Sequence, residues 1–422
     1  MKTSLCSLAA FALLLTTASA RAGDFFFHDG DRPIVFLGDS ITQQRMYTTY
    51  IETYILSRYP QWNVTFRNIG WDSDTSWLSR RDSFDTGMKR DVLSLKPAAI
   101  TIDFGMNDAR GGDAAYPRYV EHSTKLAEQL KAAGARVALV TPSPEERFEP
   151  NQPAGSAYNN MLWKYAQALQ AIAATQGVTF VDQYTPFITT IASGRSTGIL
   201  TSNGSVRLIH DTVHPNWAGH LVMAASILKG LGASALVSRA ELNAATGELL
   251  AAEKCRVDNI QAKDGNLTFR RTDDCLPWFV PEDARFALKI PGFTPLGDLS
   301  RYELRVTHLT APQYKLTIDD TNACSFTKDE LAAGVNLSLC AGPITTQAKQ
   351  LHNAVVAKND TFFVRWRKIQ LFATPAWLQT PGTEAARQQE CARVDAEIEN
   401  QEKTINHLRL PVPHVFSLTQ VQ

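Results

Sequence analysis

The sequence predicts an α/β protein with a parallel sheet between layers of helices, followed by a smaller β-rich domain and a helical C-terminal region. Three observations support this prediction. Short apolar runs alternate with helical segments from residue 32 to about 236, a rhythm typical of a parallel sheet. Period-two segments replace that rhythm near residue 240. A charged segment with a sparse apolar stripe covers residues 384–408.

Composition and the N-terminal residues limit the class of protein. At 422 residues, the chain has room for two or three domains. Its formal net charge is zero, so we expect neither nucleic acid nor an anionic membrane as a partner. Residues 1–20 combine a basic start, a short apolar stretch and a small-residue end, which is typical of a signal peptide. No later segment reaches the ~20 apolar residues of a membrane helix, so we expect a secreted or periplasmic protein without a membrane span.

The first predicted domain covers residues 21–238. Its opening strand, Ile34–Leu37, is a short apolar run that leads into Gly38-Asp39-Ser40. Further apolar runs bounded by glycine or proline read as parallel strands, and longer segments between them read as helices. The strands are expected at 34–37, 64–70, 98–105, 136–142 and 178–182, and the helices at 46–59, 119–133, 157–175 and 216–231.

Two further regions complete the predicted organisation. Residues 239–341 form the β-rich domain, with alternating apolar and polar residues that indicate antiparallel strands at 266–270, 285–290, 302–306 and 314–318. Residues 342–422 form the helical C-terminal region, expected to pack back on the body. Within it we expect a helix at 347–358, a packed strand at 362–367 and a long helix at 384–408.

Five cysteines follow the signal segment: Cys255, Cys275, Cys324, Cys340 and Cys391. In an oxidising compartment, the pairs Cys255–Cys275 and Cys324–Cys340 are plausible disulfides. Their spacing matches no zinc pattern and the histidines form no ligand cluster, so we expect no metal and no cofactor.

Polar residues follow the predicted strands where a parallel sheet would bring them together. Ser40 follows the first strand, Asn107 follows the third, and Asp211 and His214 precede a helix beyond the fifth. The carboxyl ends of parallel strands meet at one edge of the sheet. A serine hydroxyl needs a base such as His214 to become nucleophilic, and Asp211 can orient that imidazole.

Acyl transfer also needs hydrogen-bond donors for the developing oxyanion. The backbone amides of Ser40 and Gly70 and the side-chain amide of Asn107 are suitable groups. Each residue also has a purely structural interpretation. Ser40 and Asn107 could cap helices, Gly70 could form a turn at a strand end, and His214 with the following proline could start a helix.

The motifs Gly38-Asp39-Ser40, Gly70, Gly105-Met106-Asn107-Asp108 and Asp211-Thr212-Val213-His214 resemble the sequence blocks of the SGNH (GDSL) hydrolase superfamily. Residues 67–71, 363–367 and 408–414 extend the resemblance to a secreted bacterial branch with a C-terminal extension. The resemblance implies a flavodoxin-like three-layer α/β/α fold. It implies Ser40 as nucleophile, His214 as base, Asp211 as its orienting partner, and Ser40, Gly70 and Asn107 as the oxyanion hole.

Other residues near these motifs were assigned by position alone. Trp71, Asp72 and Asp74 follow Gly70 and are expected to border the substrate. Aromatic rings beside acidic side chains suit sugars, although a loop packed on the core would look the same. Residues 145–147, Glu-Glu-Arg, are expected to form a solvated loop.

These features together predict a secreted serine ester hydrolase that removes acetyl or other short acyl groups from carbohydrate through an acyl-enzyme. Its partner would be a small-molecule or polysaccharide ester. A lipid acyl hydrolase or thioesterase is the first alternative, and a non-catalytic carbohydrate-binding surface protein is the second. A metal-dependent phosphatase built on Asp39, Asp211 and His214 is a remote third.

Overall fold

The apolar runs of the first half form a five-stranded parallel sheet in the computed structural model, which describes residues 25–147, 156–201 and 204–421. The predicted signal segment lies outside these residues. The sheet order confirms the flavodoxin-like prediction: β2 (Phe66–Asn68), β1 (Ile34–Gly38), β3 (Ala99–Asp103), β4 (Arg136–Val140) and β5 (Thr179–Val181). The order changes direction at β1, so the loops after β1 and β3 open a crevice between them.

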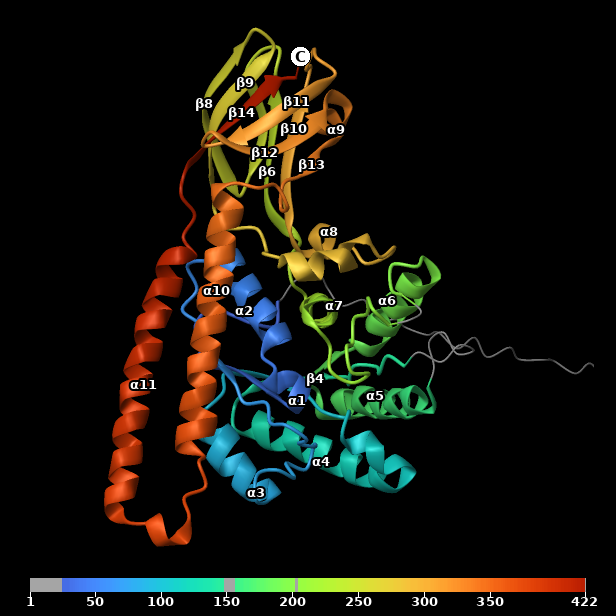
Figure 1. Cartoon of the computed structure of the whole chain (residues 1–422), viewed down its shortest axis with the longest axis vertical. Coiled ribbons are helices and arrows are strands. Elements are labelled where there is room, and N and C mark those ends of the chain that lie inside the picture. The colour runs from blue at the N-terminus through green and yellow to red at the C-terminus, as the bar shows by residue number, and fades with distance from the viewer. Residues whose placement is uncertain (1–24, 148–155, 202–203, 422) are drawn as a thin grey trace, which may run out of the picture.

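Helices cover both faces of this sheet (Figure 1). One layer contains α2 (Met46–Arg58), α6 (Tyr184–Ser196) and α7 (Trp217–Gly230), and the other contains α4 (Gly112–Ala132) and α5 (Ala157–Gln176). Strands β1 and β3 are buried along their whole length, as expected for a sheet covered on both faces. Short elements connect these layers: α1 (Ser40–Gln43), α3 (Phe84–Gly87), η1 (Met88–Val92), η2 (Leu93–Leu95) and η3 (Asp108–Gly111).

Two sheets form a β domain at one end of the molecule (Figure 1). The first contains β13 (Val335–Asn336), β10 (Arg301–Thr307), β6 (Leu236–Asn243) and β7 (Glu248–Glu253). The second contains β12 (Thr321–Thr327), β11 (Gln313–Ile318), β14 (His414–Gln420), β9 (Asn266–Asp273) and β8 (Cys255–Lys263). Alternate residues of β9, β10 and β11 are buried, which is the pattern of strands with one face toward a core. The remaining helices here are η4 (Glu282–Lys289), α8 (Pro295–Leu299) and α9 (Lys328–Ala333).

The last strand of the chain returns to this domain. Strand β14 lies between β11 and β9 and pairs antiparallel with both. The sequence analysis did not predict this strand, because only its register against distant partners gives it a place in a sheet. Phe416 and Leu418 of β14 are fully buried, so the C-terminal end is built into the second sheet.

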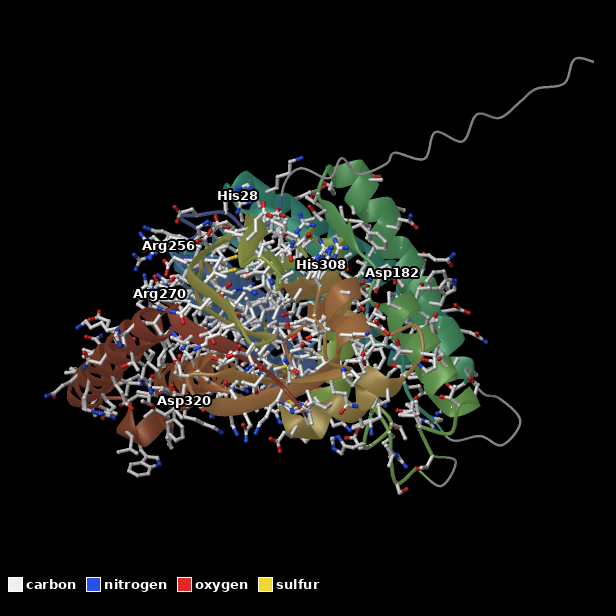
Figure 2. All side chains as sticks on the ribbon, turned by 90° about the horizontal axis from the view of Figure 1, so that it is seen from above. His28, Asp182, Arg256, Arg270, His308 and Asp320 are labelled. Carbon is white, nitrogen blue, oxygen red and sulfur yellow. A yellow bond between two sulfur atoms is a disulfide. The ribbon has the colours of Figure 1, made fainter. Side chains whose placement is uncertain are left out.

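Two long helices, α10 (Pro343–Phe363) and α11 (Pro381–Leu408), pack against each other as a hairpin. Seen from above, Figure 2 shows this hairpin on the opposite side of the molecule from the green helices of residues 157–196. Helix α10 also packs on α2 and on the edge strand β2. It therefore covers an edge that would otherwise present unpaired backbone groups. Two short elements join the helices: η5 (Val364–Gln370) and η6 (Ala376–Leu378).

A buried ion pair fixes α10 on α2. Lys358 Nζ lies 2.7 Å from Glu52 Oε1, and both side chains are almost completely buried. The Asn359 side-chain amide donates to Glu52 Oε2 at 3.0 Å and to Thr49 Oγ1 at 3.1 Å. Because each charged group has close partners, the burial is compensated, and the hairpin is a fixed part of the body.

Two predicted strands are wrong. Residues 285–290 lie mostly in the 3-10 helix η4, where a three-residue repeat places Ala284, Ala287 and Ile290 on one buried face. Residues 362–367 continue α10 into the π-helix η5, and Phe362 and Trp366 are buried four residues apart. In both segments the apolar residues follow a helical repeat, which short windows do not separate from a strand pattern.

One predicted disulfide is present and the other is not. Cys324 and Cys340 are bonded, whereas Cys255 and Cys275 are free thiols, as is Cys391. The thiols of Cys255 and Cys275 contact different carbonyls of β6, those of Arg239 at 3.2 Å and Val237 at 3.3 Å. Cys255 and Cys275 are therefore close in the sequence, but their sulfur atoms are not bonded.

Among the described helices, none is both long and apolar enough to cross a bilayer.

Candidate active site

Ser40 is the first residue of α1, two residues after the end of strand β1. The strand comes very close to its neighbours here, since a Cβ on Gly38 would lie 2.1 Å from Thr42 Oγ1 and 2.6 Å from the Asp103 carbonyl oxygen. Asp39 caps the short helix by accepting the Ile41 N–H at 2.9 Å. Ser40 itself is only half-buried. The chain thus presents its hydroxyl at the carboxyl end of the sheet.

His214 and Asp211 meet Ser40 from a different loop. His214 Nε2 lies 2.8 Å from Ser40 Oγ, and His214 Nδ1 lies 2.7 Å from Asp211 Oδ2. When the Asp211 carboxylate accepts a hydrogen bond from the Nδ1–H group, Nε2 carries the lone pair that can take the Ser40 proton. The structure therefore brings together the three residues that the sequence predicted as nucleophile, base and orienting carboxylate.

Asp211 is held in its charged form. Partial burial alone would raise the pKa of Asp211. Hydrogen bonds from the backbone N–H and imidazole of His214 and from the Val213 N–H lower this pKa to about 2. The two backbone groups donate to Oδ1 at 2.7 and 3.0 Å. The same turn holds Thr212 at a φ of 80°, a conformation that costs energy for a β-branched residue. The carboxylate thus organises a strained turn and orients the imidazole.

Glu146 holds the loop that leads to His214, a role that sequence reasoning missed. Its carboxylate accepts the backbone N–H groups of Leu208 and Ile209 at 3.0 and 2.9 Å, and its own N–H donates to the Thr212 carbonyl at 2.9 Å. Glu145 and Glu146 are 2% and 1% exposed, so the prediction of a solvated loop at 145–147 is wrong for both glutamates. The hydrogen-bond partners of Glu146 lie more than sixty residues away in the sequence, so no local sequence pattern could predict them.

The Asn107 side-chain amide reaches across the site. Nδ2 donates to the Asp74 carbonyl at 2.9 Å and lies 3.5 Å from Asp39 Oδ2. Asn107 thereby connects the loop after β3 with the loop after β2. Its amide nitrogen is the type of donor that an oxyanion requires.

The Gly70 N–H is already used inside its own loop, which differs from the prediction. It donates to Asn68 Oδ1 at 3.0 Å, so in this structure it is not a free donor for an oxyanion. Glycine is needed here for another reason, because a Cβ would lie 2.3 Å from the Gln43 backbone nitrogen. The residue allows the β2 loop to pack directly on α1.

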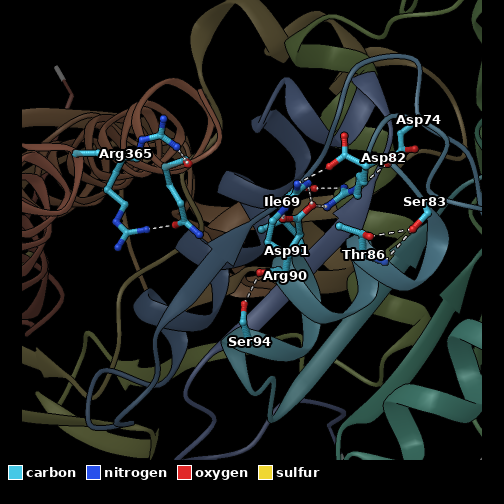
Figure 3. A network of polar contacts seen from close by, with 12 residues as sticks. Ile69, Asp74, Asp82, Ser83, Thr86, Arg90, Asp91, Ser94 and Arg365 are labelled. Atoms are coloured by element: carbon cyan, nitrogen blue, oxygen red, sulfur yellow. Dashed lines mark hydrogen bonds and ion pairs between the residues drawn. The ribbon is translucent and has the colours of Figure 1, made fainter. Parts of the chain in front are cut away.

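Of the three residues predicted to border the substrate, Asp74 is structural. Its side chain is fully buried and accepts Arg81 Nε at 2.8 Å, and Arg81 also lies 3.5 Å from Asp91. Figure 3 shows Asp74, Asp91 and Ile69 in this network. Asp72 is exposed, and Trp71 is half-buried. The carboxylate of Asp74 is thus enclosed with its cation, and the prediction that it contacts substrate is wrong.

Three further carboxyl groups are buried beneath Ser40, those of Asp39, Asp103 and Asp108. Burial raises the pKa of Asp103 to about 7 and that of Asp108 to about 6, although hydrogen bonds from Gln183 and Ser76 oppose the shift. Burial and the neighbouring Asp103 raise the pKa of Asp39 well above its usual range. These groups therefore hold protons more readily than ordinary aspartates, which reduces the negative charge close to Ser40.

No group of three or more histidine, cysteine, aspartate or glutamate side chains suited to a metal ion occurs within residues 25–147, 156–201 and 204–421. The chemistry that this arrangement can perform is attack by an activated hydroxyl on a carbonyl carbon.

Comparison with known proteins finds relatives of the first domain. Residues 36–222 match the GDSL-like lipase/acylhydrolase family. An acetylxylan esterase from Geobacillus stearothermophilus is 24% identical over 223 residues, which are 47% of this chain and 93% of the esterase. A crystal structure of an acetylxylan esterase from the same organism, 23% identical, covers 48% of this chain and 95% of its own with a TM-score of 0.40.

A second solved structure, described as a gut microbial diltiazem-metabolizing enzyme, is similar to nearly the whole chain. It covers 94% of this chain and 98% of its own, with 22% identity and a TM-score of 0.76. The fold that this likeness shows thus includes the β domain and the helical hairpin as well as the α/β domain. The family match to residues 36–222 and the acetylxylan esterase relative show that the protein is a carboxylic ester hydrolase, with an α/β domain similar to the GDSL-like lipases and acylhydrolases.

Proposed function

We propose that the protein is a secreted serine esterase that removes acetyl or other short acyl groups from carbohydrate through an acyl-enzyme. The observation that carries this proposal is the continuous series of hydrogen bonds from Ser40 through His214 to Asp211, 2.8 and 2.7 Å long. These distances lie within the reach that a nucleophile and its base require.

The proposed first step transfers the acyl group to Ser40. As Ser40 Oγ attacks the ester carbonyl carbon, its proton moves to His214 Nε2, and Asp211 stabilises the resulting imidazolium. The carbonyl oxygen becomes an oxyanion. When the tetrahedral intermediate collapses, the bond to the alcohol oxygen breaks, and His214 returns the proton to the departing alcohol.

The second step is hydrolysis of the acyl-enzyme. A water molecule gives its proton to His214 and attacks the same carbonyl carbon. The bond to Ser40 Oγ then breaks, the free acid leaves, and Ser40 recovers its proton. Both steps use the same base, which is why one histidine serves the whole cycle.

Two groups are the proposed oxyanion donors. The Ser40 N–H begins a helix, where N–H groups have no intrahelical acceptor. Asn107 Nδ2 on the adjoining loop has a second N–H besides the one donated to the Asp74 carbonyl, and that second N–H has only a long contact of 3.5 Å with Asp39. The removal of one such donor typically costs about 10²–10³ in rate. Gly70 is not among the proposed donors, since Asn68 accepts its N–H.

The substrate class and location rest on separate support. The similar Geobacillus protein is an acetylxylan esterase, which favours an acetylated polysaccharide as substrate. Residues 1–20 have the pattern of a signal peptide, and the Cys324–Cys340 disulfide suits an oxidising compartment.

The test compares acetate release from acetylated xylo-oligosaccharides with hydrolysis of p-nitrophenyl octanoate. We expect the mature protein to release acetate with the higher kcat/KM, and the matched Ser40→Ala variant to be inactive on both. A preference for the octanoyl ester would instead indicate a lipid acyl hydrolase. Binding of the oligosaccharide without turnover, unchanged in Ser40→Ala, would indicate a carbohydrate-binding protein.

A further inference from the structure

The π-helix η5 places two side chains against the loop that follows β2. The Arg367 guanidinium carbon lies 3.3 Å from the centre of the Trp71 ring. Trp366 meets the same ring edge-on at 5.8 Å, and the Arg81 guanidinium lies 5.3 Å from it. Residues almost three hundred positions apart thus form one cluster, which we call the Trp71–Arg367 cluster.

This cluster adjoins Ser40 through backbone contacts. The Trp71 N–H donates to the Gly38 carbonyl at 3.0 Å, two residues before Ser40. The next N–H, of Asp72, donates to the Gln43 side chain at 2.9 Å, and the Asp74 carbonyl accepts Asn107 Nδ2. The loop that carries Trp71 therefore lies at the rim of the site, on the β2 side.

Arg367 differs from the other arginines around it in having no acidic partner. Arg81 is paired with Asp74, Arg365 with Asp395 and Arg45 with Asp360. In Figure 3, Arg365 lies apart from the Asp74 network. Across the parts of the chain that the structure describes, Arg367 has neither an ion pair nor a hydrogen bond, and its Nε is buried without an acceptor.

The surroundings leave the charge of Arg367 without a close acidic partner. A buried donor that has lost water and gained no acceptor destabilises the protein. Asp72 and Asp91 attract the guanidinium electrostatically, but neither lies within ion-pair distance, and Arg81 repels it. An arginine remains charged under such conditions. Arg367 is held in place by Trp71, and because only its Nε is buried without an acceptor, the terminal guanidinium nitrogens are the donors that a ligand can reach.

We propose that Arg367, stacked on Trp71, binds the carboxylate of an acidic sugar unit next to the acylated one. The planar guanidinium presents parallel N–H donors that match a carboxylate in a two-bond arrangement. The preferred substrate would then be an acylated glycan that carries uronic acid units. This inference rests on the proposed function, because it extends the same site along a carbohydrate chain.

The position of Arg367 in the fold supports a role beyond packing. Segment η5 continues α10 with wider turns, and π-helical segments occur frequently at functional sites. The buried Lys358–Glu52 pair and the Arg45–Asp360 pair fix α10 on the hydrolase domain. The C-terminal hairpin therefore places at the rim a cation without an acidic partner, whereas Arg81 of the hydrolase domain is paired with Asp74 and Asp91.

The experiment compares acetylated xylo-oligosaccharides with and without a glucuronic acid branch, using the mature full-length protein. We expect the wild type to favour the acidic oligosaccharide in kcat/KM by about 10–100-fold, mainly through KM. Arg367→Gln should bring that ratio close to one, and Arg367→Lys should retain part of it. Lys368→Gln, which changes an exposed neighbouring cation, is the matched control and should keep the wild-type ratio.

The outcomes separate this inference from the proposed function. If Arg367→Gln lowers activity on both oligosaccharides equally, Arg367 only supports the loop, and the carboxylate subsite is refuted while the esterase proposal stands. A wild type that deacetylates both at equal rates refutes it as well. If neither oligosaccharide is deacetylated although p-nitrophenyl acetate is hydrolysed, the proposed carbohydrate substrate fails and the subsite fails with it.

Discussion

The carboxyl edge of the hydrolase sheet and the C-terminal hairpin contribute to this molecule in different ways. The sheet edge supplies Ser40, His214 and Asp211 from loops joined by hydrogen bonds of 2.7–2.8 Å. The hairpin supplies none of these groups. It contributes the buried Lys358–Glu52 pair and the unpaired Arg367 at the rim.

The charges in the two regions are stabilised differently. Asp211 has a side chain 45% exposed and keeps its charge through hydrogen bonds within one turn. Lys358 is 1% exposed and depends on a partner 306 residues away. We infer that the chemistry is local to the sheet edge, whereas the hairpin acts on stability and substrate choice. Changes in one region should therefore leave the property of the other region intact.

The largest expected effect is on the sheet edge. Ser40→Ala should lower kcat/KM for p-nitrophenyl acetate by at least about 10³-fold, since no other hydroxyl takes the place of the nucleophile. Its thermal stability should remain within about 1 kcal/mol of the wild type, because Ser40 is half-buried. Steady-state kinetics and thermal melts measure the two effects. Equal activity of both proteins would remove Ser40 from the mechanism.

Next in size is the loss of the buried ion pair. Lys358→Met leaves the Glu52 carboxylate buried without its cation, and we expect a destabilisation of about 3–5 kcal/mol in denaturant unfolding. At temperatures where the variant is folded, kcat for p-nitrophenyl acetate should be close to that of the wild type. The exposed Lys368→Met is the control and should change stability little. A loss below about 1 kcal/mol would show that the hairpin is not fixed by this pair.

The pH dependence of the rate separates the base from its carboxylate partner. Asp211, with a pKa of about 2, stays charged throughout mild acid. A fall in kcat/KM on acidification should therefore reflect loss of the neutral base and not of the Asp211 charge. Rates of p-nitrophenyl acetate hydrolysis, corrected for the uncatalysed reaction, provide the profile. Full activity down to about pH 4.5 would contradict the role of His214.

The smallest predicted effect concerns the carboxyl groups beneath Ser40. Burial raises the pKa of Asp103 to about 7, so the folded state holds a proton that the unfolded chain has lost. The stability associated with this proton is present in acid and is lost as the pH rises through about 7.

Asp103→Asn removes this pH dependence. Its stability relative to the wild type should increase by about 2 kcal/mol between ~pH 5 and ~pH 8. Denaturant unfolding at both pH values tests this, with the exposed Asp85→Asn as control. If Asp103→Asn changes the free energy of unfolding equally at both pH values, Asp103 is ionised in the folded protein at both pH values.

The sequence predicted the sheet edge well because strand ends are local signals. Ser40, His214 and Asp211 could be chosen from short motifs, and parallel topology then required their proximity. Short helices and strands were harder, as at residues 285–290, because a few apolar residues fit either repeat. The sequence of strand β14 does not indicate the distant strands β9 and β11 with which it pairs.

The roles of single polar groups depended on partners that a linear pattern does not show. Asp74 is enclosed by Arg81, and Glu146 accepts N–H groups from Leu208 and Ile209. The direction of the Gly70 N–H is fixed by the Asn68 side chain. Each of these facts is a matter of orientation in space, which residue types and spacing leave open.

The central claim is that Ser40 carries the acyl group, and covalent trapping tests it most directly. The protein would be treated with a p-nitrophenyl phosphonate, and the labelled peptide would be identified by mass spectrometry. We predict one adduct, on Ser40, that is absent in Ser40→Ala and forms slowly in His214→Ala. An adduct on a different residue would contradict the account. Full esterase activity of the Ser40→Ala variant would contradict it as well.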